Sequence, residues 1–479
     1  MRTGGQLLVE SLEANGVERI FCVPGESYLA ALDALYDSAI QLTVCRHESG
    51  AAMMADSYAR LTGRPGVCFV TRGPGATNAT AGLHISRQDS TPVILLIGQV
   101  QRPAREREAF QEIEYRRMMT ELAKWVAEVE APDRVPEFVA RAFATATAGR
   151  PGPVVLAFPE DVLREAAAAR PVTALPPVET APTPDQMAAL KGALVEAERP
   201  IAILGGSRWD AQAAARLQVF AERYALPVAC SFRRQSLFDN LHPCYAGDVG
   251  IAINPKLASR IKTADLVLLV GGRMSEAASS NYTLLKAPEP DQRLIHVHPG
   301  AEELGRVYRP DIAINASPAG FAAALDGLSP AAEPAWRAET EEAHADYLAW
   351  SEPPAKNPGA VQMGPIMAWL RDSLPADAIV TNGAGNFAAW VHRFYRFRQF
   401  GTQAAPVSGS MGYGVPAAVA AQQAFPERTV VAFAGDGCFL MTGQEFATAV
   451  QYDLPIVVIV LNNGMYGTIR MHQERHYPG

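Results

Sequence analysis

The chain has 479 residues, of which 48% are hydrophobic and 19% charged, a composition typical of a protein with more than one globular domain. Its formal net charge is -8 and it carries no basic stripe, so we expect neither a nucleic-acid partner nor an anionic membrane surface. No apolar run reaches the roughly 18 residues that a membrane span requires. A small molecule is therefore the expected partner.

Six cysteines are scattered along the sequence without a C-x-x-C pair. Several of them fall inside apolar runs, where a reduced cysteine packs as a small hydrophobic residue. The opening residues have the pattern of an amphipathic helix rather than of a signal peptide. These features predict a cytoplasmic protein.

Apolar runs that end in Gly or Pro alternate with Ala-rich helical stretches over residues 1–170, beginning with "RIFCVPG", "GVCFVTRGPG" and "PVILLIGQ". Short strands that alternate with helices are typical of parallel α/β layers. Residues 171–185 are rich in Pro and lack apolar periodicity, which indicates a linker.

A second set of strand patterns occupies residues 186–330, and a Pro-containing acidic connector covers 331–360. A third α/β pattern runs over 361–479 and stops where another element would be expected, so this domain looks incomplete at its C-terminus. The predicted fold is therefore α/β, with three doubly wound parallel-sheet domains.

The run "VVAFAGDG" ends a predicted strand at Gly435-Asp436-Gly437. The following "TGQE", Thr442 to Glu445, has the spacing of a helix capping box. Ligands of open parallel sheets bind where a strand ends before a helix. Asp436 is therefore expected to face a ligand crevice.

A second polar pair, Asn462-Asn463, ends the next strand after the 24 residues from Cys438 to Leu461. A right-handed crossover would place this strand end beside Asp436. Asp436, the side-chain oxygen of Asn463 and a backbone carbonyl near Met465 would suit Mg²⁺, with phosphate oxygens completing its shell. The alternative is a tight turn beside an ordinary strand end.

Several other segments agree with this pattern: "RHESGAAMMADSYAR" from Arg46, "GPGATN" from Gly73, "AFQE" from Ala109 and "GSMGYGVPAA" from Gly409. Together they resemble the thiamine diphosphate-dependent enzymes of the acetolactate synthase, pyruvate oxidase and pyruvate decarboxylase superfamily, above all acetolactate synthase catalytic subunits. The resemblance is weakest in the middle domain. It implies pyrimidine-binding, central Rossmann-like and diphosphate-binding domains, with thiamine diphosphate and Mg²⁺ as cofactors.

The resemblance assigns roles to particular residues. Glu48 would bond the pyrimidine nitrogen and favour the reactive tautomer of the cofactor. Met411 would support the bend of the cofactor, with Gly409 offering its carbonyl beside it. Asp436, Asn463 and Met465 would hold the metal. The remaining matching cofactor contacts are Pro24, Pro74, Asn78, Gly385, Asn386, Gly437, Cys438, Tyr466 and Gly467.

The implied reaction is decarboxylation of a 2-oxo acid followed by carboligation, with Gln111, Arg72 and Glu26 near the substrate. Arg72 would pair with a substrate carboxylate or with Glu26. Glu26 stands where pyruvate decarboxylases use an acid for proton transfer, which makes simple decarboxylation an alternative. A non-catalytic thiamine diphosphate-binding homologue is a third reading, because Asn386-Phe387 replaces the family's Gln-His.

The family's active site lies between subunits, which implies a homodimer or a tetramer. FAD is a less favoured cofactor, because "ILGGSRWD" is not G-x-G-x-x-G, and His296 and His298 stand where flavin-binding members have acidic residues. The position of the tryptophan that selects the second keto acid is taken by His472, so the acceptor is left open.

Overall fold

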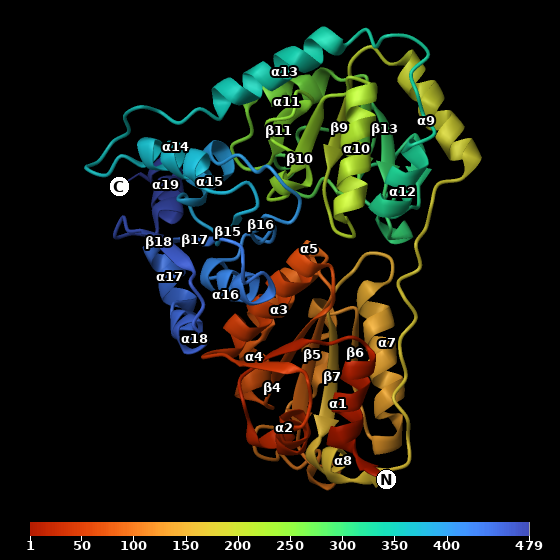
Figure 1. Ribbon diagram of the computed structural model, residues 1–479, viewed down its shortest axis with the longest axis vertical. Helices are drawn as coiled ribbons and strands as arrows, with labels where there is room; N and C mark the ends of the chain where they lie inside the picture. The colour runs from red at the N-terminus through yellow and green to blue at the C-terminus, as the bar shows by residue number, and fades with distance from the viewer. Residues whose placement is uncertain (479) are drawn as a thin grey trace. The chain divides into compact units, whose positions relative to one another are not determined.

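The computed structural model describes residues 1–478 and divides them into two compact units. One comprises residues 1–178, 381–384 and 405–478, and the other comprises 179–380 and 385–404. The units contain three sheets of parallel strands flanked by helices, which confirms the predicted α/β class (Figure 1). Within residues 1–478 no helix has both the length and the apolar character needed to cross a bilayer.

The N-terminal sheet has the strand order β3-β2-β4-β5-β7-β6. Its topological switch point lies between β2 and β4, because the chain passes from β2 to one side and then returns to the other. The strands are β2 (Arg19–Cys22), β3 (Gln41–Val44), β4 (Gly66–Val70), β5 (Val93–Gln99), β6 (Trp125–Glu128) and β7 (Val154–Pro159).

Helices cover both faces of this sheet, because the strand residues that point to either face are apolar. Val67 and Phe69 of β4 belong to the core under α1, α2 and α7, whereas Cys68 and Val70 belong to the core under α3 and α5. The helices are α1 (Gly4–Ala14), α2 (Leu29–Tyr36), α3 (Glu48–Thr62), α4 (Pro74–Asn78), α5 (Thr80–Asp89), α6 (Tyr115–Met118), α7 (Val135–Thr147) and α8 (Glu160–Arg164). Two short strands, β1 (Arg2–Thr3) and β8 (Ala166–Ala167), pair antiparallel.

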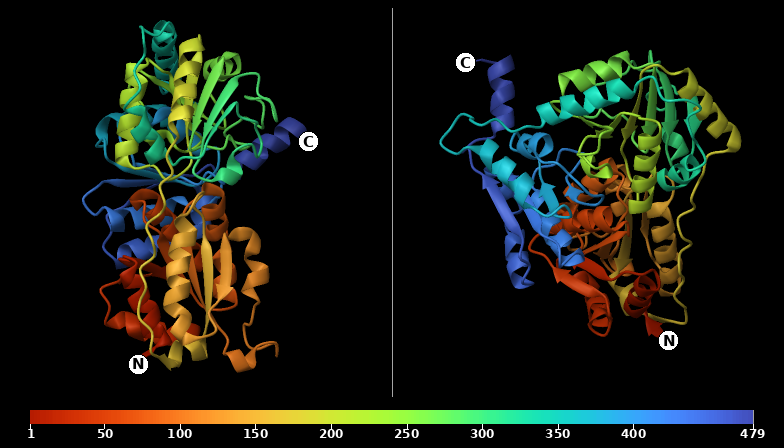
Figure 2. Two further views of the ribbon diagram at one scale, coloured as in Figure 1. Left: turned by 90° about the vertical axis from the view of Figure 1, so that its right-hand side faces the viewer. Right: turned by 45° about the horizontal axis from the view of Figure 1, so that its top comes forward.

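The central sheet has the order β11-β10-β9-β12-β13-β14, with its switch point between β9 and β12. Residues between β8 and the first helix of this domain form an extended coil (yellow in Figure 2). The strands are β9 (Pro200–Leu204), β10 (Val228–Ser231), β11 (Tyr245–Val249), β12 (Leu266–Val270), β13 (Arg293–Val297) and β14 (Ile312–Ile314). The helices are α9 (Pro184–Glu196), α10 (Ala211–Arg223), α11 (Pro255–Thr263), α12 (Pro318–Leu325) and α13 (Arg337–Trp350).

The third sheet has the order β16-β15-β17-β18. Its strands are β15 (Ile379–Asn382), β16 (Gln403–Ala404), β17 (Val430–Gly435) and β18 (Val457–Leu461). Its helices are α14 (Met363–Ser373), α15 (Ala388–Phe394), α16 (Gly414–Ala424), α17 (Asp436–Thr442), α18 (Glu445–Gln451) and α19 (Gly467–His476).

The predicted capping box at Thr442 is wrong. Thr442 is the last residue of α17, and its hydroxyl donates to the carbonyl of Gly412 rather than capping α18. Helix α18 begins after Gln444 without a side-chain cap. The spacing matches a capping box by chance. The Thr442 hydroxyl instead makes a tertiary contact, which the local sequence pattern cannot reveal.

Candidate active site

The loops after β2 and β4 meet at the switch point of the N-terminal sheet. Ser27 Oγ lies 2.8 Å from Thr71 Oγ1, and the backbone N–H of Arg72 donates to Ser27 Oγ at 3.3 Å. These bonds hold the two loops together, while Pro24 and Glu26 are exposed beside them. The fold therefore presents Glu26 and Arg72 at the edge of the sheet where ligands of such folds bind.

Glu48 is the first residue of α3, and its side chain is only 9% exposed. Asn78 Nδ2 donates to Glu48 Oε2 at 2.9 Å. A Cβ on Gly75 would lie 3.3 Å from Glu48 Oε1, so the glycine lets the carboxylate approach the turn closely. The positive end of the helix dipole favours a carboxylate at this position. Glu48 and Asn78, predicted separately, thus lie together.

Gln111 lies against the same turn. Gly73 has φ 58°, and a Cβ there would approach Gln111 Cβ to 2.7 Å. The N–H of Gly73 donates to the hydroxyl of Tyr115 at 2.9 Å. The structure therefore brings Gln111 next to the "GPG" turn that contains Pro74, although the two are far apart in the sequence.

Arg72 has partners that the sequence did not reveal. Its Nη1 lies 3.1 Å from Glu160 Oε1, and its Nε donates to the carbonyl of Phe110 at 3.2 Å. Neither partner is Glu26, which was one of the two predicted alternatives. Because Glu160 balances its charge, Arg72 also ties the loop that carries Gln111 to the start of α8.

The segment before α16 carries the residues expected to hold and bend the cofactor. Gly409 is exposed with φ 74°, and a Cβ there would meet nothing within 4 Å. Met411 is partly buried. Gly412, with φ 84°, donates its N–H to Cys438 Sγ at 3.1 Å. This segment is thus open on one side and attached to α17 on the other.

The ends of β17 and β18 are adjacent, as the spacing predicted. The two strands are parallel with Gly435 opposite Leu461, so Asp436 and Asn462 follow neighbouring strand ends. A Cβ on Gly437 would lie 2.7 Å from the ring of Tyr466, so the loop after β18 packs against the turn after β17. Gly467 begins α19 directly after Tyr466.

The residues at these strand ends fit a magnesium diphosphate. Asp436 offers a carboxylate. Among the described residues, Asn463 Oδ1 accepts one hydrogen bond, from the N–H of Met465 at 3.1 Å, so one lone pair is left. Gly437 has no side chain to separate a phosphate from the backbone. Among residues 1–478 no three His, Cys, Asp or Glu side chains form a metal cluster, as expected where one carboxylate is supplemented by amide, backbone and phosphate oxygens.

The loop after β15 contains the other predicted phosphate contacts. Gly385 has φ 142°, a conformation that side chains rarely adopt, and its carbonyl accepts the N–H of Ala388 at 3.0 Å. Asn386 and Phe387 lie between them and lead into α15. A Cβ on Gly383 would lie 2.3 Å from Cys438 Sγ, so a glycine is required where β15 ends.

Sequence reasoning missed Glu445, which is fully buried at the start of α18. Its carboxylate accepts the backbone N–H groups of Arg46 and His47 at 3.2 and 2.9 Å and the hydroxyl of Thr448 at 2.7 Å. Burial raises the pKa of Glu445 and these hydrogen bonds oppose the shift. The two backbone partners lie almost 400 residues away, beyond any local pattern, and their bonds to Glu445 fix the turn that leads to Glu48.

The central domain is different at its switch point. A Cβ on Gly206 would lie 1.8 Å from the carbonyl oxygen of Gly271, so the loops after β9 and β12 are in direct contact. The indole N–H of Trp209 donates to the Gly205 carbonyl at 2.8 Å. His296 is buried with Nε2 2.9 Å from the Gly272 carbonyl, and burial lowers its pKa.

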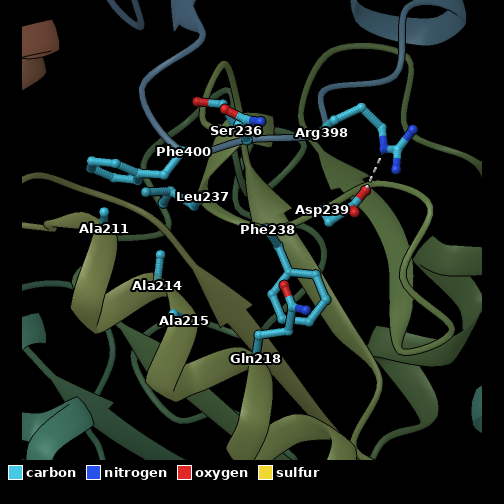
Figure 3. A pocket seen from close by; sticks show the side chains of 11 residues that line it. Ala211, Ala214, Ala215, Gln218, Ser236, Leu237, Phe238, Asp239, Arg398 and Phe400 are labelled. Carbon is cyan, nitrogen blue, oxygen red and sulfur yellow. Dashed lines mark hydrogen bonds and ion pairs between the residues drawn. The ribbon is translucent and has the colours of Figure 1, made fainter. Parts of the chain in front are cut away.

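A cavity of about 290 Å³ lies elsewhere in the second unit (Figure 3). One wall is the small-residue face of α10, and Arg398 at the rim pairs with Asp239 at 3.1 Å. None of the predicted site residues lines it. Its walls are Ala211, Ala214, Ala215, Gln218, Ser236, Leu237, Phe238, Asp239, Arg398, Gln399 and Phe400.

Comparison with known proteins agrees with this geometry. Residues 2–118 match the N-terminal TPP binding domain of thiamine pyrophosphate enzymes, residues 187–325 the central domain and residues 383–479 the C-terminal TPP binding domain. The chain therefore belongs to the thiamine pyrophosphate enzyme family.

Within that family, its relatives include acetolactate synthases. The chain is 34% identical to the acetolactate synthase large subunit of Parasynechococcus marenigrum over 99% of this chain and 78% of the relative. It is 31% identical to the isozyme 2 large subunit of Escherichia coli, over 98% and 85%, and 32% identical to a probable large subunit of Methanocaldococcus jannaschii, over 99% and 82%. The chain is thus an acetolactate synthase-like, thiamine diphosphate-dependent enzyme.

Proposed function

We propose that the protein is a Mg²⁺- and thiamine diphosphate-dependent carbon-carbon lyase and ligase that decarboxylates a 2-oxo acid and transfers the remaining fragment to a second carbonyl. The observation that carries the proposal is the buried Glu48 carboxylate, held by Asn78 beside the Gly73-Pro74-Gly75 turn. A protein that merely bound the cofactor would not need this carboxylate. When bound, the cofactor supplies a nucleophilic carbon and an electron sink.

Each of the residues at the site is proposed to have a separate role. Glu48 would hydrogen-bond the pyrimidine nitrogen of the cofactor, and its low exposure would keep that hydrogen bond strong. Met411 would support the bent cofactor, and the Gly409 carbonyl would accept a hydrogen bond from it. Asp436, Asn463 and the Met465 carbonyl would hold the metal.

The substrate faces the switch-point loops of the N-terminal sheet. Gln111 donates to the substrate from beside the "GPG" turn, and Arg72 supports this loop through Phe110. Because Glu160 already balances the charge of Arg72, the role of loop support is favoured over a direct bond to a substrate carboxylate.

A homodimer is the proposed functional unit, with a tetramer as a larger assembly, and each active site would lie between two chains. In the first unit, apolar residues of α17 and α18 are exposed, with Leu440 79% and Val450 63% accessible, as expected of a surface that a second copy covers. The six cysteines are buried and form no disulfide within residues 1–478, which supports a cytoplasmic location.

Simple decarboxylation is the second candidate, favoured by the exposed Glu26 at the switch point. A carboxylate there is free to deliver a proton in place of a second carbonyl substrate. A flavin is not part of the proposal, because the central loops at Gly206 and Gly271 touch each other where a nucleotide would bind.

One assay tests both candidates. The protein is supplied with Mg²⁺, thiamine diphosphate and pyruvate, and carbon dioxide release is followed while proton NMR identifies the organic product. Acetolactate is the expected product, whereas acetaldehyde would assign the protein to the decarboxylases. Failure to release carbon dioxide from pyruvate or from any member of a panel of 2-oxo acids would contradict both.

A further inference from the structure

A buried network of charged side chains joins α3, the end of α5 and the segment before α16, which lie side by side (Figure 1). The side chains of Asp56 and Asp89 are fully buried, and that of Arg60 is 4% exposed. Arg60 binds Asp89 and lies 3.4 Å from Asp56, which also accepts the hydroxyl of Tyr413 at 2.7 Å. Two acids thus share one guanidinium in the interior.

Three further hydrogen bonds of Arg60 and Asp89 go to one backbone segment. Asp89 Oδ2 accepts the N–H of Val407 at 2.7 Å, and Asp89 Oδ1 accepts the N–H of Ser408 at 2.8 Å. Arg60 Nη1 donates to the carbonyl of Ala405 at 2.9 Å. Burial raises the pKa of Asp89, and the Arg60 guanidinium opposes that shift. One ion pair therefore fixes three backbone groups within four residues.

The other end of the segment is fixed independently. Gly412 donates its N–H to Cys438 Sγ and accepts the hydroxyl of Thr442 at its carbonyl. Between these attachments, Gly409 closes a turn by donating to the Pro406 carbonyl at 3.0 Å. Gly409 and Met411 thus lie on a short span that is held at both ends, with its outer side open.

We propose that Asp89 and Arg60 are positioning residues that set the backbone of residues 405–408 and thereby place Met411 and Gly409 for the bent cofactor. The cofactor part of this inference rests on the proposed function. The side chains of both residues are buried, so they act through the backbone that they bind. Arg60 lies 12 residues after Glu48 on α3, a distance of about 18 Å along the helix, so one rigid helix links the activating carboxylate to this anchor.

The variant Asp89→Asn tests the anchor directly. It keeps the shape of the side chain but replaces one carboxylate oxygen with an NH2 group, which cannot accept a hydrogen bond, so one of the bonds from the N–H groups of Val407 and Ser408 is lost. The matched control is Asp346→Asn, which removes a partly buried acid that pairs with Arg260 at 3.0 Å in the other unit. Should Asp89→Asn fail to fold, Arg60→Lys keeps the charge but loses the planar fork.

The first readout needs no cofactor. Amide hydrogen exchange of residues 405–412 is measured by mass spectrometry in the cofactor-free protein. We expect exchange at least about tenfold faster in Asp89→Asn than in the wild type, and unchanged exchange in Asp346→Asn. Equal protection in the wild type and Asp89→Asn would overturn the anchor.

The second readout separates positioning from general stability. The dissociation constant of thiamine diphosphate with Mg²⁺ is measured by tryptophan fluorescence for Asp89→Asn, Met411→Ala and the double variant. We expect about tenfold weaker binding in each single variant and little further loss in the double variant, because both changes disturb one contact. Losses that multiply in the double variant would overturn the positioning role.

The anchoring of the segment by Asp89 and the binding of the cofactor can be tested separately. Wild-type protein that binds no thiamine diphosphate would contradict the proposed function and with it the role of Asp89 toward the cofactor. The amide exchange result would still decide whether Asp89 anchors the segment. Loss of protection without any change in cofactor affinity would contradict the positioning role alone.

Discussion

The N-terminal and central domains are both six-stranded, parallel and doubly wound, yet their switch points differ in chemistry. In the N-terminal domain the loops beside the switch point carry Glu26, Arg72 and, one strand further, Glu48. In the central domain the equivalent loops meet backbone to backbone at Gly206 and Gly271. The fold supplies a location for a ligand, and the loop residues decide whether it is used.

The buried polar groups of the two domains illustrate the same difference. Within the part of the chain that the structure describes, Glu48 has one hydrogen-bond partner, Asn78, and it keeps acceptor capacity for a ligand. In the central domain, the indole of Trp209 and the ring of His296 bind carbonyls of the glycine loops themselves. In the central domain these two polar side chains therefore stabilise the loops and are not available to a ligand.

The largest effect on activity is expected for Glu48→Gln in the N-terminal domain. Turnover of the 2-oxo acid should fall about 1000-fold, because glutamine cannot exchange the proton that Glu48 holds. The melting temperature should change little, since the amide can still accept from Asn78. Steady-state kinetics at saturating cofactor and calorimetry measure the two quantities. Retention of more than a tenth of the activity would place the activating group elsewhere.

A methyl group at Gly206 probes the central contact. Gly206→Ala has φ 70° and a Cβ 1.8 Å from the Gly271 carbonyl, so the free energy of unfolding should fall by about 3 kcal/mol. Gly305→Ala is the matched control, because Gly305 has φ 81° with nothing within 4 Å, and about 1 kcal/mol is expected. Urea unfolding gives both values. Equal losses would mean that the loops are not in contact.

The third sheet carries the residues that are proposed to bind the metal and the diphosphate. Asp436→Ala should weaken Mg²⁺-dependent binding of thiamine diphosphate about 100-fold, because it removes the carboxylate that is proposed as a metal ligand. Titration calorimetry with the cofactor at fixed Mg²⁺ measures the change. Binding that remained dependent on Mg²⁺ with unchanged affinity would exclude Asp436 as a ligand.

The smallest expected effect is a pH dependence of stability in the central domain. Burial raises the pKa of Asp248 to about 7, above its ordinary value of 3.8. Between these values the folded state binds more protons than the unfolded state, so stability falls as pH rises from about 4 to 7 and is level above. The loss should be on the order of 2 kcal/mol, because the residue is partly exposed.

Asp248→Asn should reduce this slope between pH 4 and 7, as followed by denaturant unfolding at several pH values. An unchanged slope in the variant would assign the pH dependence to another group.

Much of the arrangement could be predicted from the sequence. Apolar runs ended by Gly or Pro indicated the parallel sheets, and the spacing from Gly435 to Asn462 predicted adjacent strand ends because a right-handed crossover permits little else. Contacts over long sequence distances could not be predicted. Glu445 binds backbone groups near residue 46, and Asp89 binds those near residue 407, without any local periodicity to reveal them.

Arg72 shows why side-chain roles are harder to predict than strand positions. The sequence offered a substrate carboxylate or Glu26 as its partner, whereas the fold provides Glu160 at the start of α8. The choice depends on which carboxylate the chain brings within reach, and that is fixed only when β4 and β7 are placed in one sheet.

The central claim, that Glu48 activates bound thiamine diphosphate, is tested most directly by proton exchange at the thiazolium carbon. The wild type and Glu48→Gln are each saturated with cofactor and Mg²⁺, transferred to deuterium oxide, quenched and examined by proton NMR. The wild type should exchange this proton far faster than the free cofactor, and Glu48→Gln should exchange it at close to the free rate. Equally fast exchange in the two proteins, with cofactor bound in both, would contradict the account.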